Sequence, residues 1–196
     1  MQDKAITEHE SLLLIREMIQ ATKAKLSEDG FMFLLWGWLV FIASLAEFAL
    51  MQIEYPHHYI TWSVLMPLGA VVSVVYSLRK SKTENVKTYV DEFMAYLWGA
   101  FVVALLIVLG FMSKIGPVNA YPVLLVLYGI ATFVTGGALR FRPLILGGVC
   151  CGVLAIVSMF LSFEYQLLAL ALAVLLTYIV PGHLLRQQHR DAIQGA

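Results

Sequence analysis

Long runs of apolar residues make up most of this chain, and short polar segments separate them. About 20 consecutive apolar residues are enough to cross a bilayer as an α-helix. Six runs are close to this length, and they cover residues 31–52, 59–78, 92–112, 120–139, 144–163 and 165–185. The pattern therefore predicts an all-α integral membrane protein with six transmembrane helices.

The last run contains Pro181-Gly182 near its end. A proline in a helix removes one backbone hydrogen bond, and its ring clashes with the preceding turn. We therefore expect the sixth helix to kink or end at this position, close to the membrane interface.

The segment before the first run, residues 7–27, has the periodicity of an amphipathic helix. One face of residues 7–27 carries mostly apolar side chains, namely Leu12, Ile15, Ile19, Thr22 and Leu26. Thr7 and Glu10 have the spacing of a capping box. The segment is too charged to span, so residues 1–28 are predicted to form a cytoplasmic amphipathic helix. Such a helix lies on the membrane surface, docks against the bundle or binds a cytoplasmic partner.

The distribution of Lys and Arg gives the orientation. Six spans place residues 1–28, 79–91, 140–143 and the tail 188–196 on one side of the membrane. Of the 13 basic residues, all except Lys114 fall on that side or at its helix ends. Basic residues concentrate on the cytoplasmic side of bacterial membrane proteins. The prediction is an inner-membrane protein with both termini in the cytoplasm.

Composition supports lipid as the solvent and excludes some partners. Hydrophobic residues make up 60% of the 196, charged residues 13%, and the mean hydropathy is +0.81. A soluble domain is nearer half apolar and a quarter charged. The net charge is zero, so no overall field favours nucleic acid. The bilayer is the expected partner, with a homo-oligomer or a second membrane protein as further candidates.

The chain contains an internal repeat. Residues 29–40 (DGFMFLLWGWLV) and residues 91–102 (DEFMAYLWGAFV) match at seven of twelve positions with an offset of 62. The repeat unit is one helical hairpin that enters and leaves from the cytoplasm, unlike the inverted repeats of many transporters. We expect three hairpins, at residues 29–80, 91–142 and 143–187, arranged about a pseudo-threefold axis.

Small residues at regular spacing predict close helix contacts. Gly148 and Gly152 form a GxxxG pattern, Gly69 begins a stripe of small residues, and Gly136-Gly137 offers another site. Small side chains let helix backbones approach in a membrane. The alternative is that these positions line a ligand cavity.

Glu47 is the one ionisable side chain well inside a predicted span. Counted along residues 31–52, it lies roughly 5–10 Å from the bilayer centre. A carboxyl group at this depth is costly, so we expect it to be protonated, hydrogen-bonded or directed into a polar cavity. Either it is structural, or it binds a ligand, an ion or a proton. The repeat places Leu109 at the equivalent position, so the scaffold itself does not require an acid.

Two further groups are candidate sites. Trp36 and Trp98, which the repeat makes equivalent, are candidate ligand-binding residues with Glu47, as an aromatic cage for a cationic or flat ligand. Their alternative role is packing and interface anchoring. In the loop after the first span, Glu54, His57 and His58 form with Glu47 a weak candidate metal site. Interfacial aromatic and loop roles explain that segment equally well.

Two stretches resemble a group of uncharacterised small bacterial inner-membrane proteins, namely LLWGWLVFIASL (34–45) and GIATFVTGGALRFRPLILGG (129–148). The resemblance implies the bacterial cytoplasmic membrane and transfers no functional residues. The layout of six spans in repeated hairpins is also similar to that of acid-resistance membrane proteins of the HdeD type. That likeness concerns the layout alone.

Common catalytic and nucleotide-binding motifs are absent, including the P-loop, the dinucleotide fingerprint, HExxH and GxSxG. We therefore expect a non-enzymatic membrane protein without a cofactor, which binds a small ligand or serves as a transport-related subunit. The alternative is a scaffold or regulatory protein that recruits a cytoplasmic partner through its N-terminal helix. An outward-facing metal-dependent enzyme is the third interpretation.

Overall fold

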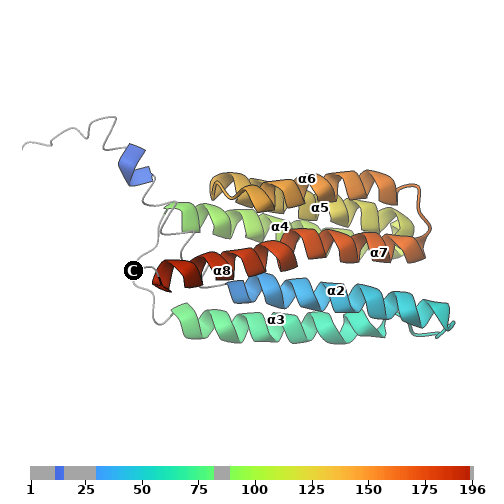
Figure 1. Cartoon of the computed structure of the whole chain (residues 1–196). Coiled ribbons are helices and arrows are strands. Elements are labelled where there is room, and N and C mark those ends of the chain that lie inside the picture. Colours follow the sequence, from blue (N-terminus) through green and yellow to red (C-terminus); the bar gives the residue numbers. More distant parts are fainter. Residues whose placement is uncertain (1–11, 16–29, 82–88, 195–196) are drawn as a thin grey trace, which may run out of the picture.

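The computed structural model describes residues 12–15, 30–81 and 89–194. All of its regular elements are helical, and they lie side by side as a bundle (Figure 1). The helices are α2 (Gly30–Gln52), α3 (Ile60–Ser81), α4 (Tyr89–Ile115), α5 (Pro117–Ala138), α6 (Arg142–Ser158), α7 (Phe163–Val174), the π-helical segment η1 (Leu175–Ile179) and α8 (Val180–Gln194). The prediction of an all-α protein is confirmed for the described residues.

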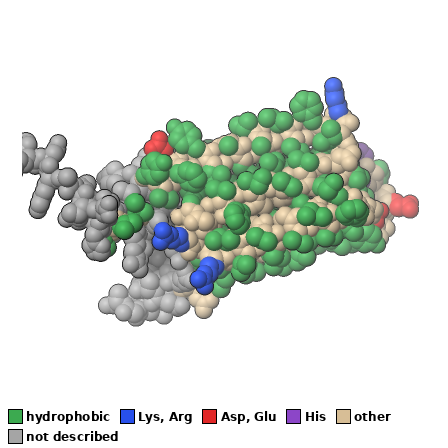
Figure 2. Space-filling view, turned by 90° about the horizontal axis from the view of Figure 1, so that it is seen from above, with side chains coloured by type: hydrophobic (Ala, Val, Ile, Leu, Met, Phe, Trp, Pro, Cys, Tyr) green, Lys and Arg blue, Asp and Glu red, His purple; other side chains and the backbone are tan. Residues whose placement is uncertain are grey.

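In the described part of the chain, five helices are long and apolar enough to span a membrane, with α7, η1 and the start of α8 counted as one, whereas α6, with 17 residues, is shorter. The space-filling view shows hydrophobic side chains along the flank of the bundle and charged side chains at its ends (Figure 2). This distribution is the one that a bilayer requires. Of the predicted amphipathic helix, residues 12–15 are helical, and the remainder lies outside the described residues.

Tight connections make neighbouring helices antiparallel. Gly116, at φ 79°, is the single residue between α4 and α5, and Pro117 starts the new helix. Only glycine adopts such a φ without strain. At one end of the bundle lie this turn and the segments 53–59 and 159–162; we call it the loop end. The opposite end carries α8, and we call it the C-terminal end (Figure 1).

Two helix pairs, α2–α3 and α4–α5, flank a central rod, and α6 packs against α5 and the rod. α2 packs against α3 and α7, and α5 packs against α4, α6 and α7. α3 rests on α2, while α4 rests on α5, so these two helices form the outer walls of the bundle. The rod of α7, η1 and α8 lies between the pairs (Figure 1).

Glycines set the spacing of α5 and α6. A Cβ atom at Gly148 would lie 2.7 Å from Phe133 N and 2.8 Å from Gly129 O, and one at Gly136 would lie 2.6 Å from Ile145 N. These backbones therefore touch, as the small-residue pattern predicts. A Cβ atom at Gly152 or Gly137 would meet nothing within 4 Å, so close packing does not require glycine at these two positions.

The final helix does not end at Pro181-Gly182, which corrects one of the two predicted outcomes. It changes to a π-helix over Leu175–Ile179 and continues as α8 to Gln194. Proline leaves a carbonyl of the preceding turn without its usual donor. The wider π turn just before Pro181 accommodates this loss, so the rod continues.

Candidate ligand-binding groove

Three adjoining cavities lie between the α2–α3 pair and the α4–α5 pair. The Glu47 cavity, of about 450 Å³, has walls from α2, α3, α4, α5 and α7. The middle cavity, of about 190 Å³, shares four lining residues with it: Val40, Met66, Leu105 and Tyr128. The tryptophan cavity, of about 320 Å³, shares three lining residues with the middle cavity: Trp36, Trp98 and Tyr178. Because each cavity shares lining residues with the next, the three adjoin one another in a row, and we call them together the groove.

The groove runs along the bundle rather than across it. Glu47 lies near the loop end of the bundle. Trp36 and Trp98 lie nearer the C-terminal end of the bundle, where α2 and α4 begin. Two walls of the Glu47 cavity come from the outer helices. α3 contributes Trp62 and Met66, and α4 contributes Leu105, Leu109 and Met112. α3 and α4 each rest on another helix, and the groove lies between them.

Glu47 is buried and is held by three hydrogen-bond partners from three segments. Trp62 Nε1, in the first turn of α3, donates to Glu47 Oε2 at 2.5 Å. Tyr121 Oη, in α5, donates to the same oxygen at 3.4 Å. His58 Nδ1, just before α3, lies 2.9 Å from Glu47 Oε1. Only 2% of Glu47 is exposed, yet its side chain lines the cavity. It is therefore both hydrogen-bonded and at the surface of the groove.

Local sequence brings these partners to the acid. The turn after α2 closes with backbone hydrogen bonds from Glu54 and Tyr55 back to the last turn of α2. That reversal places His58 and the start of α3 beside Glu47. Tyr121 is fixed by an edge-to-face contact with Phe163, at a centroid distance of 5.2 Å.

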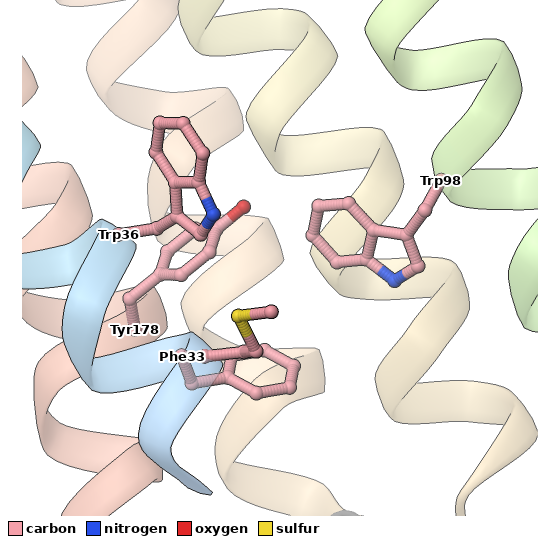
Figure 3. Close-up of a pocket in the computed structure, with 5 residues that line it drawn as sticks. Phe33, Trp36, Trp98 and Tyr178 are labelled. Atoms are coloured by element: carbon pink, nitrogen blue, oxygen red, sulfur yellow. The ribbon is translucent and has the colours of Figure 1, made fainter. Parts of the chain in front are cut away.

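The tryptophan cavity has aromatic walls. Trp98 reaches toward it from α4, and Trp36, Phe33 and Tyr178 lie on the other side (Figure 3). The ring of Trp98 makes edge contacts with Tyr178 at 6.2 Å and with Phe33 at 6.3 Å. The structure therefore brings the three candidate ligand-binding residues, Glu47, Trp36 and Trp98, into one groove.

Positions related by the repeat face the same groove. Seven pairs of lining residues are separated by 62 positions: Trp36 and Trp98, Val40 and Val102, Glu47 and Leu109, Tyr59 and Tyr121, Trp62 and Leu124, Met66 and Tyr128, and Met112 and Val174. In the sequence, the match of Tyr59 with Tyr121 was the one sign that Tyr121 belongs here. Trp62, whose repeat partner is Leu124, had no such sign.

The candidate metal ligands are not assembled. No group of three or more His, Cys, Asp or Glu side chains suited to a metal occurs in the described part of the chain. His58 turns toward Glu47, whereas its neighbour His57 lies between the rings of Tyr55 and Tyr59. Glu54 is exposed in the turn. The predicted set of Glu47, Glu54, His57 and His58 is therefore divided, because adjacent residues in this turn point in different directions.

No protein-family model, curated protein or solved structure matches this chain. The resemblance to small bacterial inner-membrane proteins therefore stays a prediction from the sequence.

Proposed function

We propose that this protein is a non-enzymatic, six-span inner-membrane protein that binds a lipophilic small molecule in its groove. It acts as a ligand-binding protein or as a transport-related subunit. The observation that carries the proposal is the row of adjoining cavities, which relates a buried carboxyl group to an aromatic cavity through shared lining residues. Ligand sites in proteins are commonly concave and mostly apolar, with a few placed polar groups.

The proposal includes α6 as the sixth span. At about 1.5 Å per residue its 17 residues reach roughly 26 Å, slightly short of a typical hydrocarbon core. A short span is accommodated by local thinning of the bilayer. Of the described Lys and Arg side chains, Arg79, Arg140, Arg142 and Arg186 lie at the C-terminal end and Lys114 at the loop end. The positive-inside rule then places the C-terminal end in the cytoplasm.

The proposal is tested by blocking the groove. Leu105 lines both the Glu47 cavity and the middle cavity, so Leu105→Trp fills the point where they join. The matched control is Leu106→Trp, because Leu106 is the next residue on α4, is 61% exposed and lines none of the three cavities. Native mass spectrometry on gently extracted protein measures which small molecules remain bound.

We expect a bound small molecule on the wild type and on Leu106→Trp, and its loss from Leu105→Trp. A protein that carries no small molecule, or one whose bound molecule is unaffected by Leu105→Trp, contradicts the proposal. A second polypeptide present at a fixed stoichiometry, together with the small molecule, favours the transport-related subunit over a binding protein that acts alone.

A further inference from the structure

Charge is unevenly distributed along the groove. Glu47 is its only charged lining residue among those that the structure describes, and neither Lys nor Arg lines any of the three cavities. An anionic ligand would therefore meet a buried acid and no compensating cation. In a low-dielectric site such a charge is weakly screened, so it discriminates strongly between ligands of opposite sign.

Two of the three partners of Glu47 bring no positive charge to its carboxyl group. Trp62 and Tyr121 are uncharged donors, and an indole N–H can only donate. The third partner, His58, approaches Glu47 from the solvent side, because 32% of its side chain is exposed. A carboxylate has about four acceptor positions, and these three contacts leave room for one more on the cavity side.

The walls supply the second half of a cation site. Aromatic rings line the groove from end to end: Tyr59, Trp62, Tyr121 and Tyr128 in the Glu47 cavity, and Phe33, Trp36, Trp98 and Tyr178 in the tryptophan cavity. The negative face of an aromatic ring attracts an organic cation, most strongly for tryptophan and where water is excluded. The hydroxyls of Tyr128 and Tyr178 make no hydrogen bond with the residues that the structure describes.

From these observations we infer that the groove selects lipophilic organic cations, with Glu47 as the counter-charge and the aromatic walls as the contact surface. The inference rests on the proposed function and adds the chemical class of the ligand. A bulky cation with delocalised or shielded charge fits best, because it loses little hydration when it enters an apolar groove.

Three probes of nearly equal size and shape separate charge from hydrophobicity: tetraphenylphosphonium, neutral tetraphenylmethane and anionic tetraphenylborate. Binding of each is measured by equilibrium dialysis against the full chain in lipid nanodiscs, with empty nanodiscs as the blank. We expect the cation to bind at least tenfold more tightly than the neutral probe, and the anion to bind more weakly than both.

The decisive variant is Glu47→Gln. It keeps the size of the side chain and removes the charge, so we expect binding of the phosphonium to weaken at least tenfold while binding of the neutral probe is unchanged. The matched control is Leu106→Gln on α4, at a side chain that is 61% exposed and lines none of the three cavities, so it adds the same amide outside the groove without removing a charge. This control should keep the preference for the cation.

The outcomes distinguish the inference from the proposed function. If the neutral probe binds as tightly as the cation, or Glu47→Gln binds the cation normally, the groove binds ligands but the inference of cation selectivity is wrong. If no probe binds and no small molecule is found on the native protein, the proposed function fails as well. Should Glu47→Gln lose the neutral probe too, Glu47→Asp decides: the inference requires that this charged variant keep the preference for the cation.

Discussion

At the scale of single residues, Glu47 connects the elements that enclose the groove. Its two oxygens accept from α3 and α5 and pair with the turn before α3. Hydrogen bonds to a carboxylate are stronger than those between neutral groups. The acid therefore holds the loop end of the groove at a fixed width, in addition to any contact with a ligand.

Replacing one donor tests this role. Trp62→Phe removes the indole N–H that contacts Glu47 but keeps an aromatic ring, so we expect the free energy of unfolding to fall by about 1 kcal/mol, within the range found for hydrogen bonds in membrane proteins. The measurement is unfolding in mixed micelles titrated with denaturing detergent. Trp38→Phe, at a side chain that is 44% exposed, is the matched control and should change little. Equal effects of the two substitutions would show that the Trp62 bond adds no stability.

The sequence identifies Glu47 as a residue of interest because an acid in an apolar span is costly. It does not identify the partners. Tyr121 lies 74 positions away, and His58 was singled out as a metal ligand instead. Such partnerships depend on how the helices pack, which hydropathy does not encode.

At the scale of helices, α5 and α6 form the closest pair because glycines remove the side chains between them. Phe133 N and Gly129 O lie where a Cβ of Gly148 would be, and both are backbone atoms that cannot rotate away. The GxxxG pattern alone treats Gly148 and Gly152 as equivalent. Only the packed structure shows that Gly148 faces α5 and that a Cβ atom added at Gly152 would meet nothing within 4 Å.

This difference predicts opposite effects for the same substitution. Gly148→Ala forces the two backbones apart and should lower the free energy of unfolding by about 2 kcal/mol. Gly152→Ala meets no neighbour and gains helix propensity, so we expect no loss of stability. Thermal unfolding of both variants in one detergent gives the comparison. If Gly152→Ala is the more damaging of the two, the α5–α6 contact is not the one described.

At the scale of the whole molecule, hydropathy locates the helices well and their ends less well. Residues 31–52 and 59–78 were predicted as the first two spans, close to α2 (Gly30–Gln52) and α3 (Ile60–Ser81). Residues 144–163 were predicted as one span, whereas α6 ends at Ser158. The turn that follows contains Met159 and Phe160, which are apolar but 68% and 85% exposed. A hydropathy profile does not distinguish an apolar turn from an apolar helix, so the sequence predicts a helix that is longer than α6 at this end.

Because α6 is shorter than the other helices, whether it crosses the membrane needs a direct test. If α6 spans the bilayer in the proposed orientation, Phe160 lies on the periplasmic side and Arg142, at the other end of α6, lies on the cytoplasmic side. Single cysteines at Phe160→Cys and Arg142→Cys, in a background with Cys150→Ala and Cys151→Ala, report the side through a membrane-impermeant maleimide. We expect labelling of Phe160→Cys in intact cells, labelling of Arg142→Cys only after permeabilisation, and labelling of His57→Cys as the external control.

The alternative patterns have distinct meanings. Labelling of Phe160→Cys and Arg142→Cys from the same side would make α6 a re-entrant helix, and the number of spans would be five. A full exchange of the two patterns would keep six spans and reverse the orientation, so that the Glu47 cavity lies near the cytoplasm. The Glu47 end of the groove faces the outside only under the expected pattern. The direction from which a lipophilic cation reaches its counter-charge therefore depends on this measurement.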